Sequence, residues 1–224
     1  MIPDTRLPET GLAKTGLAEA RRDGPGTPGP AARSEPASPR QAEFEALYRD
    51  DPDPWGMETS AYEGAKYDAT LAALPRERFG RGLEVGCSIG VLSMRLAERC
   101  DRLLALDVSE GALARARGRP GAERVDWRRA EVPGGWPAGR YDLIVLSEVL
   151  YFLEPDEVRA LAELAARDLS PGGALVLVNW LGACDRTLDG EGAARLFTDA
   201  ARPGLRVAHG TRRPLYRIDV LERA

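Results

Sequence analysis

Short apolar runs alternate with amphipathic segments along the chain from about residue 82 onward. The runs have the length of buried strands, and the segments between them repeat apolar residues at helical spacing. Strands are expected near residues 82–86, 103–107, 124–129, 141–147, 174–180, 205–209 and 215–222. Helices are expected near residues 90–99, 109–117, 156–169 and 190–200. This alternation predicts a parallel sheet wound on both faces through right-handed crossovers.

Local signals refine this pattern. Ser109 and Asp156 are expected to cap the helices that follow them, because such side chains accept hydrogen bonds from first-turn amides. Pro171-Gly172-Gly173 is expected to end a helix and turn the chain into the next strand. The segment between the last two strands is too short for a helical crossover, so these strands should pair antiparallel. The prediction is an α/β fold with a mostly parallel seven-stranded sheet, helices on both faces and an antiparallel last strand.

The first 42 residues differ in composition from the rest. Residues 1–40 hold seven of the 17 prolines and no aromatic residue, too little apolar surface to offset the entropy lost on folding. We therefore expect a disordered tail over 1–42, without the apolar segment of a signal peptide, and one domain over 43–224. Aromatic and acidic residues alternate from Phe44 to Trp55, and a helix is expected from Tyr62 to Leu74.

Charge and cysteine content narrow the class of partner. The net charge is −4 and the isoelectric point about 5.3, with no basic block, so a nucleic-acid partner is not expected. The sequence contains no run of 18 apolar residues, so we do not expect a membrane-spanning helix. Cys87, Cys100 and Cys184 lack metal or redox spacing, so we predict no metal site and a reducing cytoplasm. A small-molecule partner is expected.

From Gly82 to Gly90 a short apolar strand passes through small residues into a helix, as in loops that hold nucleotide cofactors. The dinucleotide fingerprint would need glycines at 86, 88 and 91, but the chain has Ser88 and Val91, which disfavours a nicotinamide oxidoreductase. The pattern Glu84-x-Gly86-x-Ser88-x-Gly90 resembles the acid-and-glycine motif of the Rossmann-like class I S-adenosylmethionine-dependent methyltransferases. The resemblance implies S-adenosylmethionine as cofactor and S-adenosylhomocysteine as product.

The acidic residues agree with this resemblance. S-adenosylmethionine carries a sulfonium, an ammonium and no pyrophosphate, so Glu84 beside the loop suits it electrostatically. Asp107 ends the next strand, at the spacing where an acid meets ribose hydroxyls. The alternative is that each acid simply ends an ordinary strand.

By this resemblance, cofactor-binding residues follow the carboxyl ends of the parallel strands. The residues concerned are Glu84, Gly86, Cys87, Ser88, Gly90, Asp107, Val108, Ala130, Glu131 and Ser147. Ala130 and Glu131 would border adenine, although Glu131 can equally be a solvated acid. Tyr151, Asn179 and Trp180 are candidates for contact with the substrate. Cys87 and Tyr151 also suit plain packing roles.

A narrower resemblance involves the segment before the loop. Asp53-Pro54-Trp55 followed by Thr59-Ser60-x-Tyr62-Glu63-x-x-Lys66-Tyr67 is similar to the NodS-type methyltransferases, which include an enzyme that methylates the free amine of a chitooligosaccharide. The resemblance covers roughly residues 43–222 and implies N-methylation of an amine, such as an amino sugar. Trp55, Tyr62 and Lys66 would lie near the cofactor, with Lys66 paired to its carboxylate or simply solvated. Arg195 replaces a histidine frequent in these relatives, which leaves the substrate open.

Methyl transfer to an amine requires that the amine first lose its proton. His209, the only histidine, lies at a predicted strand end and has a suitable reference pKa; a structural role is the alternative. Glu148 is the next candidate base, and Tyr62 follows. O- or C-methylation and a non-catalytic cofactor-binding subunit remain open alternatives, and the sequence does not determine the oligomeric state.

Overall fold

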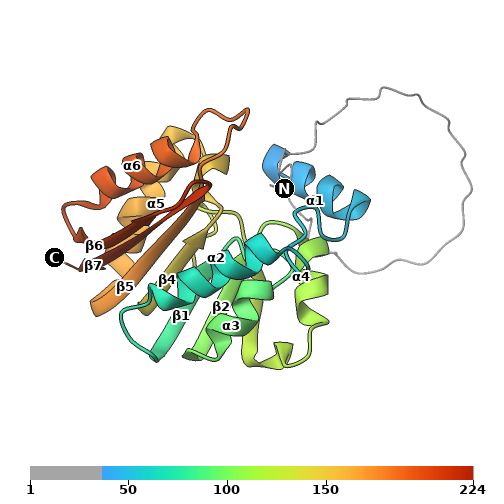
Figure 1. Ribbon diagram of the computed structural model, residues 1–224, viewed down its shortest axis with the longest axis horizontal. Coiled ribbons are helices and arrows are strands. Elements are labelled where there is room, and N and C mark those ends of the chain that lie inside the picture. The colour runs from blue at the N-terminus through green and yellow to red at the C-terminus, as the bar shows by residue number, and fades with distance from the viewer. Residues whose placement is uncertain (1–36, 224) are drawn as a thin grey trace, which may run out of the picture.

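Seven strands form one mixed sheet in the order β3-β2-β1-β4-β5-β7-β6 (Figure 1). The computed structural model describes residues 37–223. The strands are β1 (Phe79–Val85), β2 (Cys100–Asp107), β3 (Val125–Arg129), β4 (Tyr141–Ser147), β5 (Leu169–Trp180), β6 (Leu205–Arg212) and β7 (Tyr216–Arg223). The first five strands are parallel, while β7 pairs antiparallel with both β5 and β6. The predicted fold class, including the antiparallel last strand, is confirmed.

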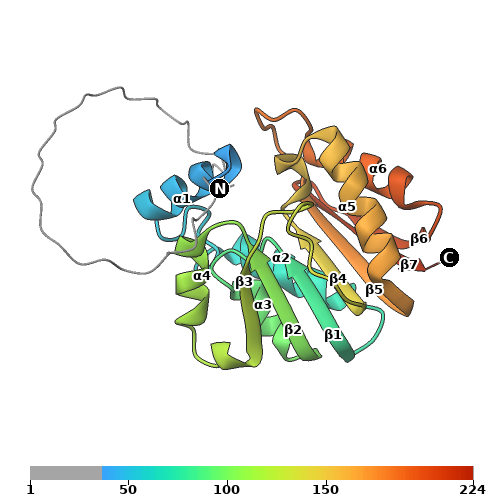
Figure 2. The same cartoon turned by 180° about the vertical axis from the view of Figure 1, so that it is seen from behind.

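Helices cover both faces of this sheet. They are α1 (Pro39–Asp50), α2 (Ala61–Ala72), α3 (Val91–Ala97), α4 (Glu110–Arg117), α5 (Pro155–Asp168) and α6 (Gly190–Ala201), with short 3-10 turns at Ala122–Arg124 and Leu150–Phe152. Apolar residues of α2, α3 and α4 pack on one face of the sheet (Figure 1). Those of α5 and α6 pack on the other (Figure 2).

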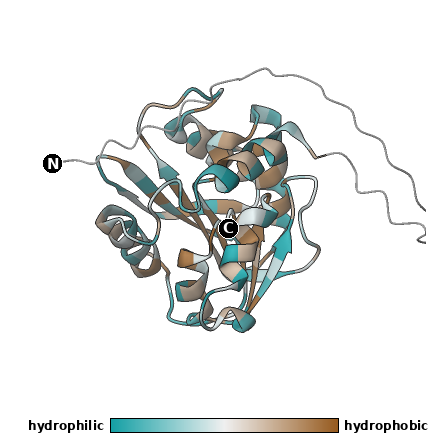
Figure 3. Ribbon diagram, turned by 90° about the vertical axis from the view of Figure 1, so that its right-hand side faces the viewer, coloured by the Kyte–Doolittle hydropathy of each residue, from teal (hydrophilic) through white to brown (hydrophobic). Residues whose placement is uncertain are grey.

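The central strands are buried because apolar helices cover both of their faces. Residues Leu143–Leu146 of β4 and Ala174–Val178 of β5 have no exposed surface, and Figure 3 shows brown, hydrophobic stretches along strands inside the molecule. Burying apolar area is the dominant favourable contribution to folding. This burial also fixes the positions of the strand ends, where the chain exits into polar loops.

Two local predictions are corrected by the structure. The N-cap of α5 is Glu154, and Asp156 lies in the first turn, because Pro155 suits the first helical position. Pro171-Gly172-Gly173 lies inside β5, at a register shift opposite Tyr141 and Leu143. A bulge accommodates the proline and the positive φ of Gly172, so no separate turn is needed. Ser109 does cap α4 as predicted.

The boundary of the N-terminal segment is also corrected. Helix α1 begins at Pro39, where Ser38 accepts a hydrogen bond from the amide of Gln41. Residues 39–42 are therefore helical, contrary to the prediction of a tail up to 42. The rest of the predicted disordered tail, residues 1–36, lies outside the described residues. Within residues 37–223, no helix is long and apolar enough to cross a membrane.

Candidate active site

A cavity of about 170 Å³ opens at the carboxyl ends of β1, β2 and β4, beneath α1 and α2. Strand ends of an open α/β sheet are where ligands bind. Of the residues predicted from the sequence, those that line the cavity are Trp55, Tyr62, Lys66, Glu84, Gly86, Cys87, Ser88, Asp107, Val108, Ala130, Glu131, Ser147, Glu148, Tyr151 and Trp180. Gly90, Asn179 and His209 do not line it.

The glycine loop joins β1 to α3. Gly86 has φ +78°, and a Cβ there would lie 2.3 Å from the Val149 Cγ2 atom, so only glycine fits without a shift. Gly90 has φ +80°, but its missing Cβ makes room for Trp127 and Ala116. The prediction that Gly90 contacts a cofactor is therefore not supported by its position. Its role here is to begin α3 and pack against β3 and α4.

Asp107 stabilises the loop from the end of β2. Its Oδ2 accepts a hydrogen bond from the Ser88 amide at 2.8 Å, and its Oδ1 accepts one from the Ser109 amide at 2.9 Å. Burial raises the pKa of Asp107 to about 6, even though these amide bonds favour its charged form. Each oxygen keeps a second lone pair that a ligand hydroxyl can use.

Glu84 lies inside β1 and is 1% exposed. Burial raises the pKa of its carboxyl group to about 7. Its Oε2 atom is buried and has no hydrogen-bond partner within residues 37–223, and the nearby Ser93 hydroxyl, which favours the charged form of Glu84, is likewise left without one. An unpartnered buried oxygen is costly, which indicates that a donor belongs beside it.

Lys66 joins two carboxylates at the β4 side of the cavity. Its Nζ donates to Glu63 Oε1 at 3.0 Å and to Glu148 Oε1 at 2.6 Å. Burial alone would lower the pKa of Lys66, but Glu148 and Glu63 outweigh it and raise that pKa. The lysine is therefore not a solvated surface residue, and it already has two anionic partners.

Glu148 is held in one position by three donors. Besides Lys66, the Tyr151 hydroxyl and the Trp180 amide donate to its Oε2, each at 2.8 Å. Its backbone has φ +58°, which costs energy for a residue with a side chain. Strain at a pocket residue with a complete set of donors indicates a functional position.

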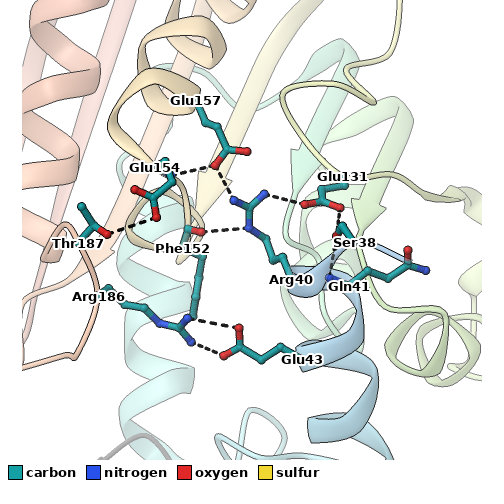
Figure 4. A network of polar contacts seen from close by, with 10 residues as sticks. All are labelled: Ser38, Arg40, Gln41, Glu43, Glu131, Phe152, Glu154, Glu157, Arg186 and Thr187. Carbon is teal, nitrogen blue, oxygen red and sulfur yellow. Dashed lines mark hydrogen bonds and ion pairs between the residues drawn. The ribbon is translucent and has the colours of Figure 1, made fainter. Parts of the chain in front are cut away.

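Helix α1 forms the outer wall of the cavity through a polar network (Figure 4). Arg40 donates to Glu131 Oε1 at 2.8 Å, to the Phe152 carbonyl at 3.0 Å and to Glu157. The other oxygen of Glu131 accepts from Ser38. Glu131 therefore connects the sheet to α1, an interaction that the sequence analysis did not foresee when it placed this acid beside adenine.

Aromatic side chains of the same wall were missed by the sequence analysis. Phe44 and Tyr48 of α1 line the cavity together with Met57, and the Tyr48 hydroxyl is hydrogen-bonded to Ser88 Oγ. The spacing of four residues between Phe44 and Tyr48 was a helical signal. The surrounding polar residues obscured it.

His209 lies on β6, and β7 and β5 separate this strand from β4, β1 and β2, whose ends form the cavity. It is exposed on β6, the edge strand, and its Nε2 atom is 3.1 Å from Thr211 Oγ1. The predicted position was wrong because β6 continues to Arg212, so His209 is inside the strand. Asn179 is fully buried. It lies so close to Gly190 that a Cβ added to this glycine would be 3.4 Å from the Cβ of Asn179. It therefore packs against the start of α6 instead of facing the cavity.

The sheet order, the glycine loop, the acid inside β1 and the acid that ends β2 define a class I methyltransferase. The family model of nodulation protein S (NodS) matches residues 41–179, more than half of the chain. The chain belongs to the NodS family.

Individual relatives agree with this assignment. Nodulation protein S of Bradyrhizobium diazoefficiens is 37% identical over 103 residues, 45% of this chain and 49% of that protein. The Sinorhizobium fredii protein is 34% identical over 127 residues, 55% of this chain and 59% of that protein. The chain thus spans about half the length of these curated relatives.

Solved structures show the same fold. A protein of Pseudomonas syringae, assigned as a methyltransferase, has a TM-score of 0.63 and 34% identity over 73% of this chain and 100% of that chain. The N-methyltransferase NodS of Bradyrhizobium japonicum, solved in complex with S-adenosylhomocysteine, has a TM-score of 0.68. It is 21% identical and covers 83% of this chain and 99% of its own.

Proposed function

We propose that this protein transfers the methyl group of S-adenosylmethionine to an amine nitrogen of a small molecule. The observation that carries the proposal is the unpartnered Oε2 of Glu84, buried beside the glycine loop. The ammonium group of the cofactor supplies the missing donor and a compensating charge. The NodS structure bound to S-adenosylhomocysteine supports the same choice of cofactor.

The residues around the loop fit the rest of the cofactor. Asp107 would accept from ribose hydroxyls, next to Val108, while Ala130 and Glu131 would border adenine at the end of β3. Ser147, Cys87 and the backbone around Gly86 would surround the methionine part. The bound cofactor supplies a methyl group that its sulfonium already activates. The chain has to orient the acceptor, exclude water and manage one proton.

The acceptor would bind at the β4 and β5 side of the cavity. Tyr62, Tyr151, Phe152 and Trp180 line it there, next to the carboxylates that Lys66 joins. Aromatic faces and carboxylates favour a cation, which supports an amine over a neutral hydroxyl or carbon acceptor. The likeness to N-methylating NodS makes an amino sugar the first acceptor to test. All three cysteines are free thiols, in accord with a reaction in the cytoplasm.

Calorimetric titration tests the cofactor. Micromolar binding of S-adenosylmethionine and S-adenosylhomocysteine, with none of NADH, is the expected result. Mass spectrometry of reactions with glucosamine and simple primary amines then tests turnover. Tight cofactor binding without any methylated product would favour a non-catalytic subunit, and product from hydroxyl or carbon acceptors alone would contradict N-methylation.

His209→Asn is expected to leave the methylation rate within about threefold of wild type at every pH, because surface substitutions away from a site rarely matter more. The side chain is exposed on the edge strand and contacts only Thr211 among hydrogen-bond partners in residues 37–223. Initial rates from pH 6 to 9 check this. A loss of the rate at neutral pH that recovers at high pH would restore His209 as the base.

A further inference from the structure

Two carboxylates share one ammonium at the acceptor side of the cavity. Glu63 and Glu148 both accept from Lys66, so with all three groups ionised the cluster carries one net negative charge. Glu63 and Lys66 belong to α2, while Glu148 follows β4. The cluster therefore connects the helix that covers the cavity to the sheet below it.

The two carboxylates differ in how many donors they have. Both oxygens of Glu148 accept, from Lys66, Tyr151 and Trp180. Hydrogen bonds to a carboxylate favour its charged form. Glu148 is therefore held by donors of the protein on both oxygens, which leaves it little room to face an acceptor amine.

Glu63 is less well provided with donors. Its carboxylate accepts from Lys66, and the side chain lines the cavity while the residue is only 8% exposed. Burial raises the pKa of Glu63; Lys66 opposes the rise, Glu148 adds to it as a second negative charge, and the Tyr67 hydroxyl opposes it to a smaller extent. Such a group takes up a proton closer to neutral pH than an ordinary glutamate.

The other titratable groups around Glu63 are unsuited to accept a proton. Lys66 remains charged between its two partners. Burial raises the pKa of Tyr62 to about 12, and it raises those of Tyr67 and Tyr151 as well. Glu84 lies on β1, beside the loop that would hold the cofactor. Glu63 is the remaining acid on the acceptor side.

We infer that Glu63 is the proton acceptor for the amine that is methylated, with Glu148 a positioning residue that holds Lys66. The inference rests on the proposed function. The acceptor ammonium loses one proton to the Glu63 carboxylate, which becomes a carboxylic acid. The free nitrogen lone pair then forms the N–C bond while the S–C bond breaks and its electron pair stays on sulfur. The product is a methylammonium with S-adenosylhomocysteine, and Glu63 afterwards releases its proton to solvent.

The kinetic test compares Glu63→Gln with wild type on glucosamine and a panel of primary amines. Removal of a general base costs about 100-fold or more, so kcat/KM is expected to fall at least that far at neutral pH. The deficit should shrink as the pH rises and more of the amine is already neutral. Affinity for S-adenosylhomocysteine should stay within about threefold. Activity of Glu63→Gln within about threefold of wild type at all pH values would overturn the inference.

Three further variants separate catalysis from folding. Asp68→Asn removes an exposed carboxylate of the same helix that pairs with Arg95 and should change nothing. Glu63→Asp keeps a carboxylate and should keep the wild-type shape of the pH profile at a lower rate, even if Glu63→Gln folds poorly. Glu148→Gln should lower the rate but keep that shape as well. A Glu148→Gln profile that matches the one expected for Glu63→Gln would instead make Glu148 the base.

A measurement without turnover tests Glu63 whether or not an acceptor is found. Carbon-13 NMR of labelled glutamates in the S-adenosylhomocysteine complex should contain one carboxyl that titrates above the ordinary value of 4.5 and is absent from Glu63→Gln. Titration of this carboxyl at or below 4.5 would overturn the inference. Wild-type protein that binds cofactor but methylates no amine would contradict the proposed function and the inference with it, whereas methylation of an amine together with an ordinary Glu63 titration would contradict the inference alone.

Discussion

Asp107→Ala is expected to weaken binding of S-adenosylmethionine about 100-fold. The carboxylate holds the amides of Ser88 and Ser109 and would offer its remaining lone pairs to the ribose. A hydrogen bond to a charged group contributes about 1.5–3 kcal/mol, and each 1.4 kcal/mol is about a tenfold change in affinity. The variant also leaves two buried amides without an acceptor, so the glycine loop loses its preorganised shape. Calorimetric titration gives the dissociation constants.

Asp101→Ala is the matched control for this change. Asp101 lies on the same strand, β2, but near its other end, where it forms an exposed ion pair with Arg78. An exposed pair contributes little, so this variant should bind the cofactor like wild type. If Asp107→Ala also bound it within threefold, the assignment of the ribose site to the end of β2 would be wrong.

Glu84→Gln is expected to weaken binding of S-adenosylmethionine about 30-fold at pH 8. It is also expected to remove most of the pH dependence of this binding. The wild-type carboxyl has a pKa of about 7 in the free protein, and it must be ionised to pair with the ammonium. Affinity of the wild type should therefore rise about tenfold between pH 6 and pH 8, with release of a proton on binding. Asp107, with its pKa of about 6, adds to this rise at the lower end of the range.

The raised pKa values of Glu84 and Asp107 also make the stability of the free protein depend on pH. A carboxyl whose folded pKa exceeds its unfolded pKa binds its proton more tightly when folded, so ionisation opposes folding. The free energy of unfolding should therefore fall as the pH rises from about 4.5 through 7, the range between the two pKa values of Glu84. Thermal unfolding of wild type and Glu84→Gln across that range checks the sign. A wild-type curve as flat as that of the variant would contradict the burial of a chargeable Glu84.

The sheet and the glycine loop could be predicted from the sequence because short runs of neighbouring residues determine both. Continuous apolar runs define β2, β4 and β5, and small residues at 86 and 88 mark the turn that follows β1. Strand β6 was harder, since Val207 and His209 of this edge strand are exposed. No burial pattern marks its end at Arg212. The position of His209 was misjudged for that reason.

The contacts that complete the site depend on tertiary structure. Glu148 and Lys66 are 82 positions apart, and Arg40 and Glu131 are 91 apart. Nothing in the local sequence around these residues indicates that the folded chain brings each pair within hydrogen-bonding distance. Residue type and position single out Lys66 and Glu148, but nothing in the sequence shows that these two side chains pair or that Glu63 shares the same ammonium.

Lys66 is one of only two lysines among 31 basic residues, the other being Lys14, and it is 3% exposed. Nearly every other positive charge is a guanidinium, which common acylating reagents do not attack. Within residues 37–223 the protein therefore contains a single primary amine, on the buried side of α2 where this helix faces the cavity. Its acylation requires the Nζ atom to leave Glu63 and Glu148, which makes Lys66 a built-in reporter of how firmly this cluster is held.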